Sequence, residues 1–187
     1  MHSVQRPRSV RALQIVAAAR RVLEAEGLEA VSMRRIADEV GIRAPSLYKH
    51  FPDKRALEAA IISTAFEEQA VAFTAAVRDS NDPLAALSMA YRGFAMEHPH
   101  LYRLMTGREL QRDLLAPGVE DRAGRPLVDA VGGDLNRARA AWAFAHGMAL
   151  LELTNRFPPD ADIEAAWREG IDAFRPAPTP TRRSNRS

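Results

Sequence analysis

The chain has 187 residues, 47% of them hydrophobic, a formal net charge of +2 at pH 7 and no cysteine. This length suffices for one domain or for a small domain joined to a medium one, and the lack of cysteine excludes disulfides and thiolate chemistry. No run of 18 or more apolar residues is present, and the arginine-containing start lacks the apolar segment of a secretory signal. We therefore expect a cytoplasmic protein with no membrane contact.

Charge is distributed unevenly along the chain. Residues 1–55 contain 11 lysines and arginines against 6 aspartates and glutamates, whereas residues 56–175 contain 12 against 18. A basic end is what binding to nucleic-acid phosphates requires, although two halves can also differ in charge by chance. Arginine outnumbers lysine 24 to 2, which indicates a GC-rich bacterial genome.

The first nine residues, 1–9, are polar and basic and are predicted to form a flexible arm. Such an arm can reach a DNA groove or simply be solvated. From Val10 to Glu26, apolar residues recur on one side of an amphipathic helix, which Gly27 ends.

The stretch from Ser32 to Lys54 has the pattern of a helix-turn-helix motif. Ser32 is a suitable N-cap, Gly41 can adopt the left-handed conformation that ends the first helix, and Pro45 fits the first turn of a second helix over about 44–50. Leu47 and Phe51 are expected to point inward. The outward positions are then Arg43, Ala44, Ser46, Tyr48 and Lys49. A short helix of small and polar residues held by its neighbours is the form of a recognition helix.

The run from Ile36 to Phe51, followed by Lys54 and Leu57, resembles the N-terminal DNA-binding domain of the TetR family of transcriptional regulators. The resemblance covers about residues 11–65 without gaps. It implies phosphate contacts from Tyr48, His50 and Lys54, and a contribution from Ser32.

Arg43 is the best candidate for reading a base, because a guanidinium matches the O6 and N7 edge of guanine. Arg34 and Arg35 are candidates for backbone contact, with a solvated helix face as the alternative, and Tyr48 can also serve in packing. The predicted DNA-binding set is Ser32, Arg34, Arg43, Ala44, Pro45, Ser46, Tyr48, Lys49, His50 and Lys54.

Asp53 is a plausible N-cap for a long helix that continues to about Arg78, with Val71 among its apolar contacts. Lys54 and Arg55 in its first turn oppose the helix dipole, which a DNA phosphate would offset. A helix is predicted over 83–97, with Asp82 as its cap. After an interruption at 98–100, a short helix is expected to continue to about residue 106, and another is predicted over 126–131. Residues 107–124 are expected to be mostly loop with some helix.

The segment 134–157 is predicted to be a helix that a second subunit covers. Between Ala140 and Leu151 only His146 is conventionally polar, and a helix that is apolar all round must be buried all round. A last helix follows, capped by Asp160 or Asp162. The two helices suggest an isologous dimer interface. Its predicted residues are Phe144, Leu151, Trp167, Ile171 and Phe174.

This second half resembles the C-terminal domain of a TetR subgroup that carries a Trp-x-x-x-His-Gly signature, here Trp142, His146 and Gly147. The resemblance implies ligand binding and dimerisation. Mostly apolar and aromatic walls suggest an apolar or aromatic effector with one polar anchor, with ordinary core packing as the alternative for each residue. The predicted pocket residues are Met89, Phe94, Tyr102, Met105, Trp142, His146 and Met148.

The sequence therefore predicts an all-α fold of about nine helices. It has an arm over 1–9, a helix-turn-helix domain over 10–55, a ligand-binding and dimerisation domain over 56–175, and a disordered tail over 176–187. The predicted function is that of a homodimeric repressor that binds a palindromic operator in double-stranded DNA and is released by a small effector. A non-catalytic helical adaptor that uses the helix-turn-helix face for protein contact is the alternative.

Catalysis is not expected. No Gly-rich phosphate loop, G-x-S-x-G or H-E-x-x-H motif occurs. His98 and His100, or His146 with Glu152, lack further metal ligands at a usual spacing. We therefore expect no enzyme activity, no metal and no cofactor.

Overall fold

The computed structural model describes residues 9–78 and 80–176, and within them it confirms the predicted all-α fold. Nine α-helices and two short 3-10 helices account for the regular structure of these residues. The elements are α1 Val10–Glu26, η1 Leu28–Ala30, α2 Met33–Glu39, α3 Ala44–Tyr48, α4 Lys54–Arg78, α5 Pro83–Glu97, α6 Pro99–Thr106, η2 Arg112–Leu114, α7 Val119–Ala130, α8 Leu135–Leu153 and α9 Ile163–Asp172.

Most of the predicted arm and most of the predicted tail lie outside the described residues. Ser9, the last residue of the predicted arm, belongs to the fold as the N-cap of α1, because its side chain accepts a hydrogen bond from the backbone N–H of Ala12 at 3.2 Å. Of the predicted tail, only Pro176 is described. Within the described ranges, no helix combines the length and the apolarity that crossing a membrane requires.

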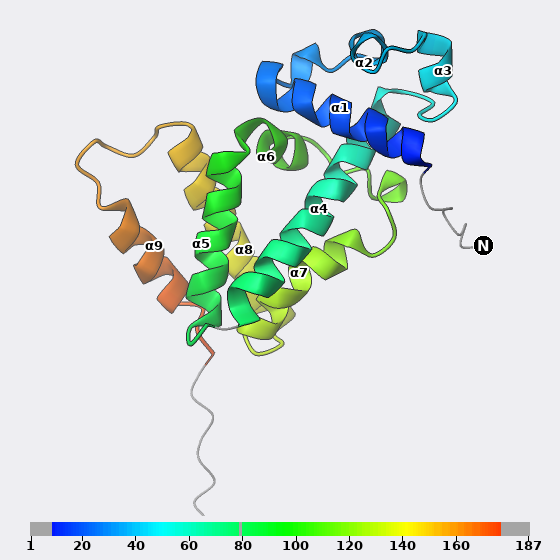
Figure 1. Ribbon diagram of the computed structural model, residues 1–187. Coiled ribbons are helices and arrows are strands. Elements are labelled where there is room, and N and C mark those ends of the chain that lie inside the picture. The colour runs from blue at the N-terminus through cyan, green and yellow to red at the C-terminus, as the bar shows by residue number, and fades with distance from the viewer. Residues whose placement is uncertain (1–8, 79, 177–187) are drawn as a thin grey trace, which may run out of the picture.

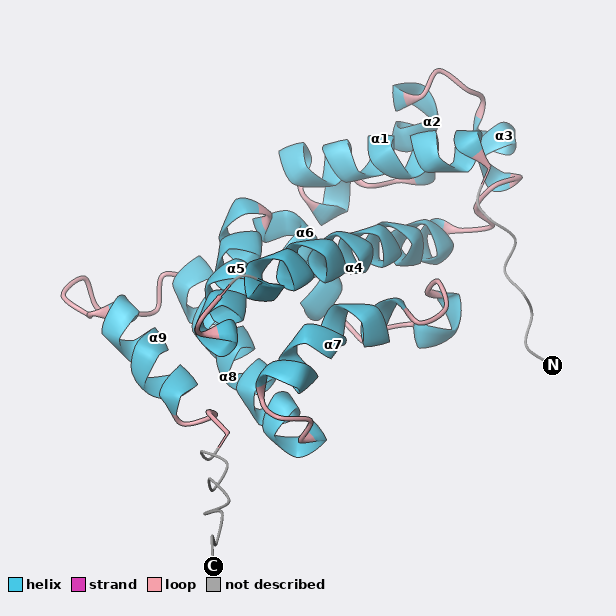
Figure 2. Ribbon diagram, turned by 60° about the horizontal axis from the view of Figure 1, so that its bottom comes forward, coloured by secondary structure: helices cyan, strands magenta, loops and turns pink. Residues whose placement is uncertain are grey.

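Two hydrophobic clusters divide the molecule, and α4 belongs to both halves. The first cluster joins α1, α2 and α3 to the beginning of α4 through residues such as Leu23, Leu47 and Leu57. The second cluster lies among α5, α7, α8 and α9. Figure 1 shows α1–α3 grouped at one end of α4, and Figure 2 shows α4 running lengthwise from that group toward the other helices. The predicted domain boundary at 55/56 therefore falls within the first turn of a continuous helix.

The short helix α6 contributes to both clusters. Leu101 and Leu104 are buried in the first cluster, while Tyr102 is buried in the second. Because successive residues of a helix point about 100° apart, a helix of only eight residues can pack on two neighbours at once. This helix physically joins the two ends of the molecule.

The long helix α4 has the predicted bounds but a different apolar face. The side chain of Asp53 caps it by accepting from the backbone N–H of Ala56 at 2.8 Å. Val71, which we expected to be an apolar contact, is 72% exposed, whereas Phe73 is buried. The apolar residues of α4 surround it so evenly that periodicity alone does not select the buried side.

The prediction for 107–131 was wrong in its helix boundaries. Helix α7 begins at Val119, seven residues before the predicted start, and Pro126 lies inside it. Gly118 in the left-handed conformation precedes the helix, and Glu120 and Asp121 occupy its first turn, where acidic side chains favour the helix dipole. Proline costs a helix interior one hydrogen bond, but here the helix is held along α4 by buried Val119 and by an ion pair from Arg122 to Glu67.

Two of the predicted interface residues, Trp167 and Ile171, are buried in their own chain. Trp167 is 2% exposed, and its indole N–H donates to Glu152 Oε1 of α8 at 2.6 Å. Arg92 of α5 donates to the other oxygen of the same carboxylate and also pairs with Glu164. A polar network thus joins α5, α8 and α9, and these two side chains belong to the core rather than to a surface for a second subunit.

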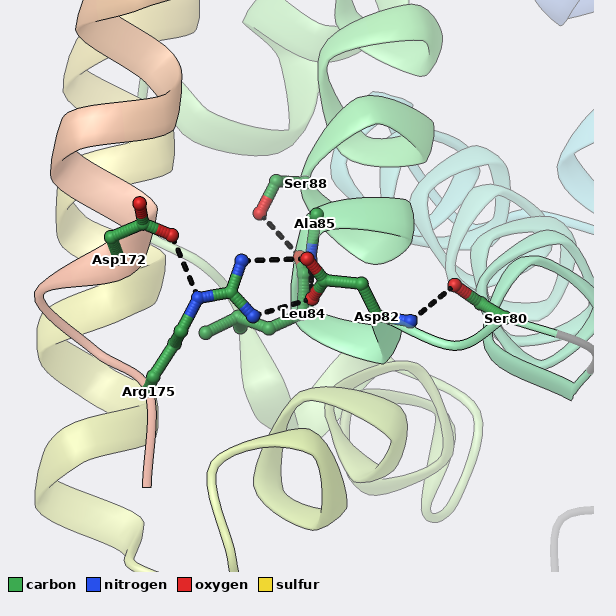
Figure 3. A network of polar contacts seen from close by, with 7 residues as sticks. All are labelled: Ser80, Asp82, Leu84, Ala85, Ser88, Asp172 and Arg175. Atoms are coloured by element: carbon green, nitrogen blue, oxygen red, sulfur yellow. Dashed lines mark hydrogen bonds and ion pairs between the residues drawn. The ribbon is translucent and has the colours of Figure 1, made fainter. Parts of the chain in front are cut away.

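The C-terminal end of α9 is fastened to the beginning of α5 (Figure 3). Arg175 donates to both carboxylate oxygens of Asp82, at 2.8 and 2.6 Å, and its Nε donates to Asp172 at 2.7 Å. Asp82 is at the same time the N-cap of α5 and accepts from the backbone N–H of Ala85. The predicted cap of α9 is resolved in favour of Asp162.

Candidate DNA-binding surface and ligand cavity

The predicted helix-turn-helix is formed by α2, a turn at Gly41 and α3. Ser32 caps α2 by accepting from the backbone N–H of Arg35 at 3.1 Å. Gly41 has a φ of +66°, which a residue with a side chain rarely adopts, and it allows the chain to reverse between the helices. Pro45 lies in the first turn of α3, as predicted, and α3 ends at Tyr48, so that His50 lies in the turn that follows.

The short recognition helix is anchored by its inward residues and presents the others to solvent. Leu47 is fully buried and Phe51 nearly so. Five of the predicted DNA-binding side chains are exposed and have no side-chain partner within the described ranges: Arg34, Arg43, Tyr48, Lys49 and His50. Pro45 is also exposed, and Ala44 and Ser46 are partly so. Helix α3, the residues that flank it and Arg34 of α2 therefore offer a set of unpaired donors.

Two neighbouring basic residues are not free in the same way. The Arg35 guanidinium donates to Glu39 at 2.7 Å and to Glu26 at 2.8 Å, and these bonds hold the pKa of the Glu39 carboxyl below its usual value. Lys54 Nζ lies 3.4 Å from the backbone oxygen of Leu28 and 3.7 Å from Glu58 Oε1. Arg35 is thus paired with carboxylates of its own domain. Lys54 makes one long hydrogen bond, which leaves two of its three N–H donors available.

A cavity of about 720 Å³ lies among α4, α5, α6, α7 and α8, with Ile171 of α9 also in its wall. Four of the seven predicted pocket residues line it, namely Tyr102, Met105, Trp142 and His146. The other three do not. Met89 is half exposed on α5, Met148 is buried in the second cluster, and Phe94 packs between the two clusters. Helical spacing places residues on a face but does not say which face borders an empty volume.

One wall of the cavity carries a chain of hydrogen bonds between aromatic side chains. The Tyr91 and Tyr102 hydroxyl oxygens are 2.9 Å apart, and Tyr102 Oη lies 2.7 Å from His146 Nδ1. The Trp142 ring stacks on His146 at a centroid distance of 6.1 Å. Burial raises the pKa of Tyr91 and Tyr102 and lowers the pKa of His146, so that all three are uncharged at neutral pH.

The sequence analysis missed two lining residues that matter for this cavity. Tyr91 of α5 and Gln69 of α4 both line the cavity, and neither is in the predicted pocket set. Gln69 is 5% exposed and makes no hydrogen bond within the described part of the chain. The sequence carries little signal for Gln69, because this residue directly follows the charged Glu67 and Glu68.

Comparison with known proteins gives two matching family models. The model described as bacterial regulatory proteins of the tetR family matches residues 15–61, and the model of the tetracyclin repressor-like C-terminal domain matches residues 84–174. The chain belongs to the TetR family.

Relatives and solved structures agree over most of the chain. The uncharacterized HTH-type transcriptional regulator Rv0681 of Mycobacterium tuberculosis is 28% identical over 179 residues, which cover 90% of this chain and 82% of that protein. The uncharacterized HTH-type regulator YobS of Bacillus subtilis is 24% identical over 170 residues, 86% of this chain and 88% of that one.

A protein of unknown function from Rhodococcus sp. RHA1 superposes with a TM-score of 0.72 at 25% identity and covers 92% of this chain and 97% of that one. TetR from Acinetobacter baumannii AYE superposes with a TM-score of 0.59 at 21% identity, covering 89% of this chain and 95% of that one, which shows a shared fold.

The two family models match the two ends of this TetR-family regulator. The first model spans α2, α3 and most of α1, and the second spans α5 to α9 almost entirely. The interval 62–83 between the matches holds the shared second half of α4. The chain is thus a transcriptional regulator with a helix-turn-helix DNA-binding domain and a family-typical ligand-binding domain. Since the family's named relatives are transcriptional regulators, it is not an enzyme.

Proposed function

We propose that the protein is a repressor that binds a palindromic operator as a homodimer and leaves it when a small, largely apolar effector enters the 720 Å³ cavity. One observation carries the proposal: α6 borders the cavity through Tyr102 and Met105 and packs into the DNA-binding domain through Leu101 and Leu104. A molecule in the cavity therefore touches a helix that packs on α1 and α4, two helices of the DNA-binding domain's hydrophobic cluster.

The DNA contacts follow from the unpaired side chains of α2, α3 and the turn after α3. Arg43, at the N-cap of α3, would enter the major groove and bond a guanine edge with two donors. Tyr48, Lys49 and His50 flank it and would bind phosphates, which set register without specifying sequence. Ser32 and Lys54 would contribute to phosphate binding from the starts of α2 and α4.

Dimerisation would use the exposed side of α8. Ala143, Gly147 and Leu150 recur at four- and three-residue spacing, and Leu151 adjoins them. Leu150 and Leu151 are 41% and 40% exposed, although leucines are usually buried. Small residues beside leucines allow two helices to approach closely, so this stripe supports an isologous contact between two copies of α8. Phe144 and Phe174 face each other within one chain and would border the contact rather than form it.

The release step would run through α6. His98 Nδ1, at the start of α6, lies 3.0 Å from Glu24 Oε1 near the end of α1, and the His100 ring lies beside Gly27, the C-cap of α1. A ligand that displaces Tyr102 would shift α6 and, with it, the end of α1. Two recognition helices can enter successive major grooves only when they are about 34–36 Å apart, so a shift in each subunit removes one half-site from reach.

The subgroup assignment belongs to the same proposal. Trp142, His146 and Gly147 carry the Trp-x-x-x-His-Gly signature on α8. The first two line the cavity, and the third lies in the proposed interface stripe. One motif would thus serve ligand and partner from two different sides of one helix.

The test is selection of bound fragments from the source genome by the full chain, at low salt and again at raised salt. The expected result is a palindrome whose half-sites are about one helical turn apart. The protein should retain this sequence at raised salt, whereas its binding to random DNA should be lost. If a folded dimer enriches no site at either salt concentration, the operator-binding proposal is wrong and protein contact through the same face becomes the better explanation.

A further inference from the structure

Gln69 on α4 differs from the two buried serines of the described chain. Ser63 accepts a hydrogen bond from the backbone N–H of Ala116 at 3.0 Å, and Ser88 donates to the carbonyl of Leu84 at 2.7 Å. The Gln69 side chain is only 5% exposed, yet it makes no hydrogen bond with any described residue. Buried amides without a partner are uncommon, because leaving one unsatisfied costs free energy.

The Gln69 carboxamide faces the cavity of about 720 Å³, which the residue lines from α4. Side-chain polar atoms that are sealed from solvent and lack a hydrogen bond occur in the described ranges only on Glu24 and Glu58. The amide of Gln69 lacks a hydrogen bond but is not among them, so it borders open volume rather than the packed core. A molecule in the cavity can therefore reach it.

The buried part of the cavity wall is uncharged among the residues that the structure describes. It includes Phe73, Leu87 and Ile171, whereas charged lining residues such as Arg108 and Glu109 are exposed. Burying an unpaired charge among apolar side chains is costly, so the part of a ligand that lies beside Gln69 must be uncharged. An ionised carboxylate is therefore excluded as the group that meets the amide.

The chemistry of a carboxamide indicates which uncharged group fits it best. The amide oxygen accepts hydrogen bonds and the amide nitrogen donates them, and the two atoms lie side by side on one planar group. A ligand that satisfies both atoms is favoured over one that satisfies a single atom, because each unsatisfied atom costs free energy. A lactam presents its N–H and its carbonyl side by side as well, so it can form two parallel hydrogen bonds with the amide. A ketone or an ester can bond only the amide nitrogen.

We propose that Gln69 determines the ligand specificity of the cavity and selects an uncharged lactam, or another cis-amide, with an apolar body. The ligand N–H would donate to Gln69 Oε1, and the ligand carbonyl would accept from Nε2. Phe66 and Phe73 line the cavity three residues before and four residues after Gln69, on the same side of α4, and would contact the apolar body. The inference rests on the proposed function only in taking this cavity as the effector site.

Two probes of nearly the same shape test the proposal: carbostyril, a bicyclic lactam, and N-methylcarbostyril. Both have the ring system and the carbonyl, but the methyl group removes the N–H donor. They are titrated into the full chain without DNA, and binding is followed by isothermal titration calorimetry. Carbostyril should bind about three- to ten-fold more tightly, as one neutral hydrogen bond provides. The added methyl group increases apolar area, so without that bond the methylated probe would bind at least as well.

A substitution assigns the preference to Gln69. Gln69→Met removes the amide but keeps an unbranched side chain of similar length, so the preference for carbostyril should disappear. Naphthalene, which needs no hydrogen bond, should still bind this variant and so show that the cavity is intact. Gln14→Met makes the same exchange at an exposed glutamine of α1 and should leave the preference unchanged. Thermal unfolding shows whether the variants are folded. If Gln69→Met is not folded, Gln69→Leu replaces it, and the two carbostyrils on the unmodified chain decide by themselves.

Several results would overturn the proposal. They are equal affinity of the unmodified chain for the two carbostyrils, tighter binding of the methylated probe, saturation by neither carbostyril, or an unchanged preference in a folded Gln69→Met variant. Because no DNA is present, the outcome is independent of operator binding. A chain that prefers carbostyril but selects no genomic site would refute the proposed function and leave this inference intact, and the reverse result would refute only this inference.

Discussion

The ring of Phe144 on α8 lies directly against the α-carbon of Gly170 on α9, and a β-carbon at Gly170 would overlap three of its ring atoms. The same ring packs edge-on to Trp167, with centroids 5.8 Å apart. Glycine is therefore needed at position 170, in the middle of a helix, because the Phe144 ring of the neighbouring helix occupies the space that a β-carbon would need. This contact makes α8 and α9 one packed unit within a single chain.

Replacement of Gly170 by alanine should therefore destabilise the protein. In an exposed helix, Gly→Ala stabilises by about 1 kcal/mol, but forcing extra volume into a packed site costs about 1–3 kcal/mol. The overlap with three ring atoms favours the upper end of that cost. We expect Gly170→Ala to lower the free energy of unfolding by about 1–2 kcal/mol net, measured by urea denaturation.

The control is Gly93→Ala in α5. A β-carbon at Gly93 meets no atom within 4 Å, and its φ is not positive. Only the propensity gain remains, so this variant should be more stable by about 0.5–1 kcal/mol. Equal changes in the two variants would show that the Phe144 contact does not restrict Gly170.

Arg43→Ala should relax base preference. The Arg43 side chain is exposed and unpaired within the described ranges, so its removal should not disturb the fold. We expect a loss of about 1–3 kcal/mol at the selected operator and little change on random DNA, measured by fluorescence anisotropy. An equal loss on both kinds of DNA would assign Arg43 to the backbone.

Lys54→Ala should weaken all DNA sequences alike. Because a phosphate contact releases a counterion, the slope of log affinity against log salt concentration should fall by about 1. Arg35→Ala provides the contrast. Its guanidinium is held by Glu26 and Glu39, so a smaller change in the salt slope is expected, and a change as large as that of Lys54→Ala would mean that these ion pairs open on DNA.

Leu150→Glu should prevent dimerisation. The substitution places a charge in the middle of the exposed α8 stripe, where the isologous contact would bring it next to its own copy. Sedimentation analysis should find a folded monomer, with affinity for the full palindrome reduced at least ten-fold. Leu13→Glu, at a leucine of α1 that is 50% exposed, is the control and should leave the dimer unchanged. A dimer that survives Leu150→Glu would show that the interface lies elsewhere.

The comparison of sequence and structure shows which physical signals a sequence carries. Caps and turns act locally, and Ser32, Gly41, Asp82 and the start of α5 were therefore predicted at the right residues. The position of α7 depends on packing against α4, which no local pattern reports, and packing outweighed the break that Pro126 suggests. Trp167 was taken for an interface residue because an apolar side chain looks the same whether its own chain or a partner covers it.

The site was predictable to a similar degree. Recognition-helix residues could be named because the motif is short and contiguous, whereas the cavity is formed by six helices whose relative positions no spacing reveals. Tyr102, Trp142 and His146 were named through the resemblance. Gln69 was missed because its importance lies in the absence of a partner, which only the arrangement of the surrounding helices establishes.

The last prediction concerns Asp82, whose pKa lies below its usual value chiefly because Arg175 donates hydrogen bonds to its carboxylate. A carboxyl with a lowered pKa in the folded state contributes stability above its ordinary pKa of about 3.9, and that contribution is lost as the pH falls through the folded-state pKa. Arg175→Leu should therefore raise the pKa of Asp82, though the bond from the Ala85 N–H keeps it from rising fully. Carbon NMR of the carboxyl group measures this shift.

The accompanying loss of stability at pH 7 should be at most about 1 kcal/mol, because both side chains are partly exposed and solvent screens the pair. The difference in stability between Arg175→Leu and the unmodified protein should shrink as the pH falls below the ordinary pKa of an aspartate, since a protonated Asp82 no longer attracts Arg175. Arg125→Leu, which removes an exposed pair with Asp129 in α7, should leave the titration of Asp82 unchanged. A pKa of Asp82 that is the same in all three proteins would show that the backbone N–H of Ala85, and not Arg175, sets it.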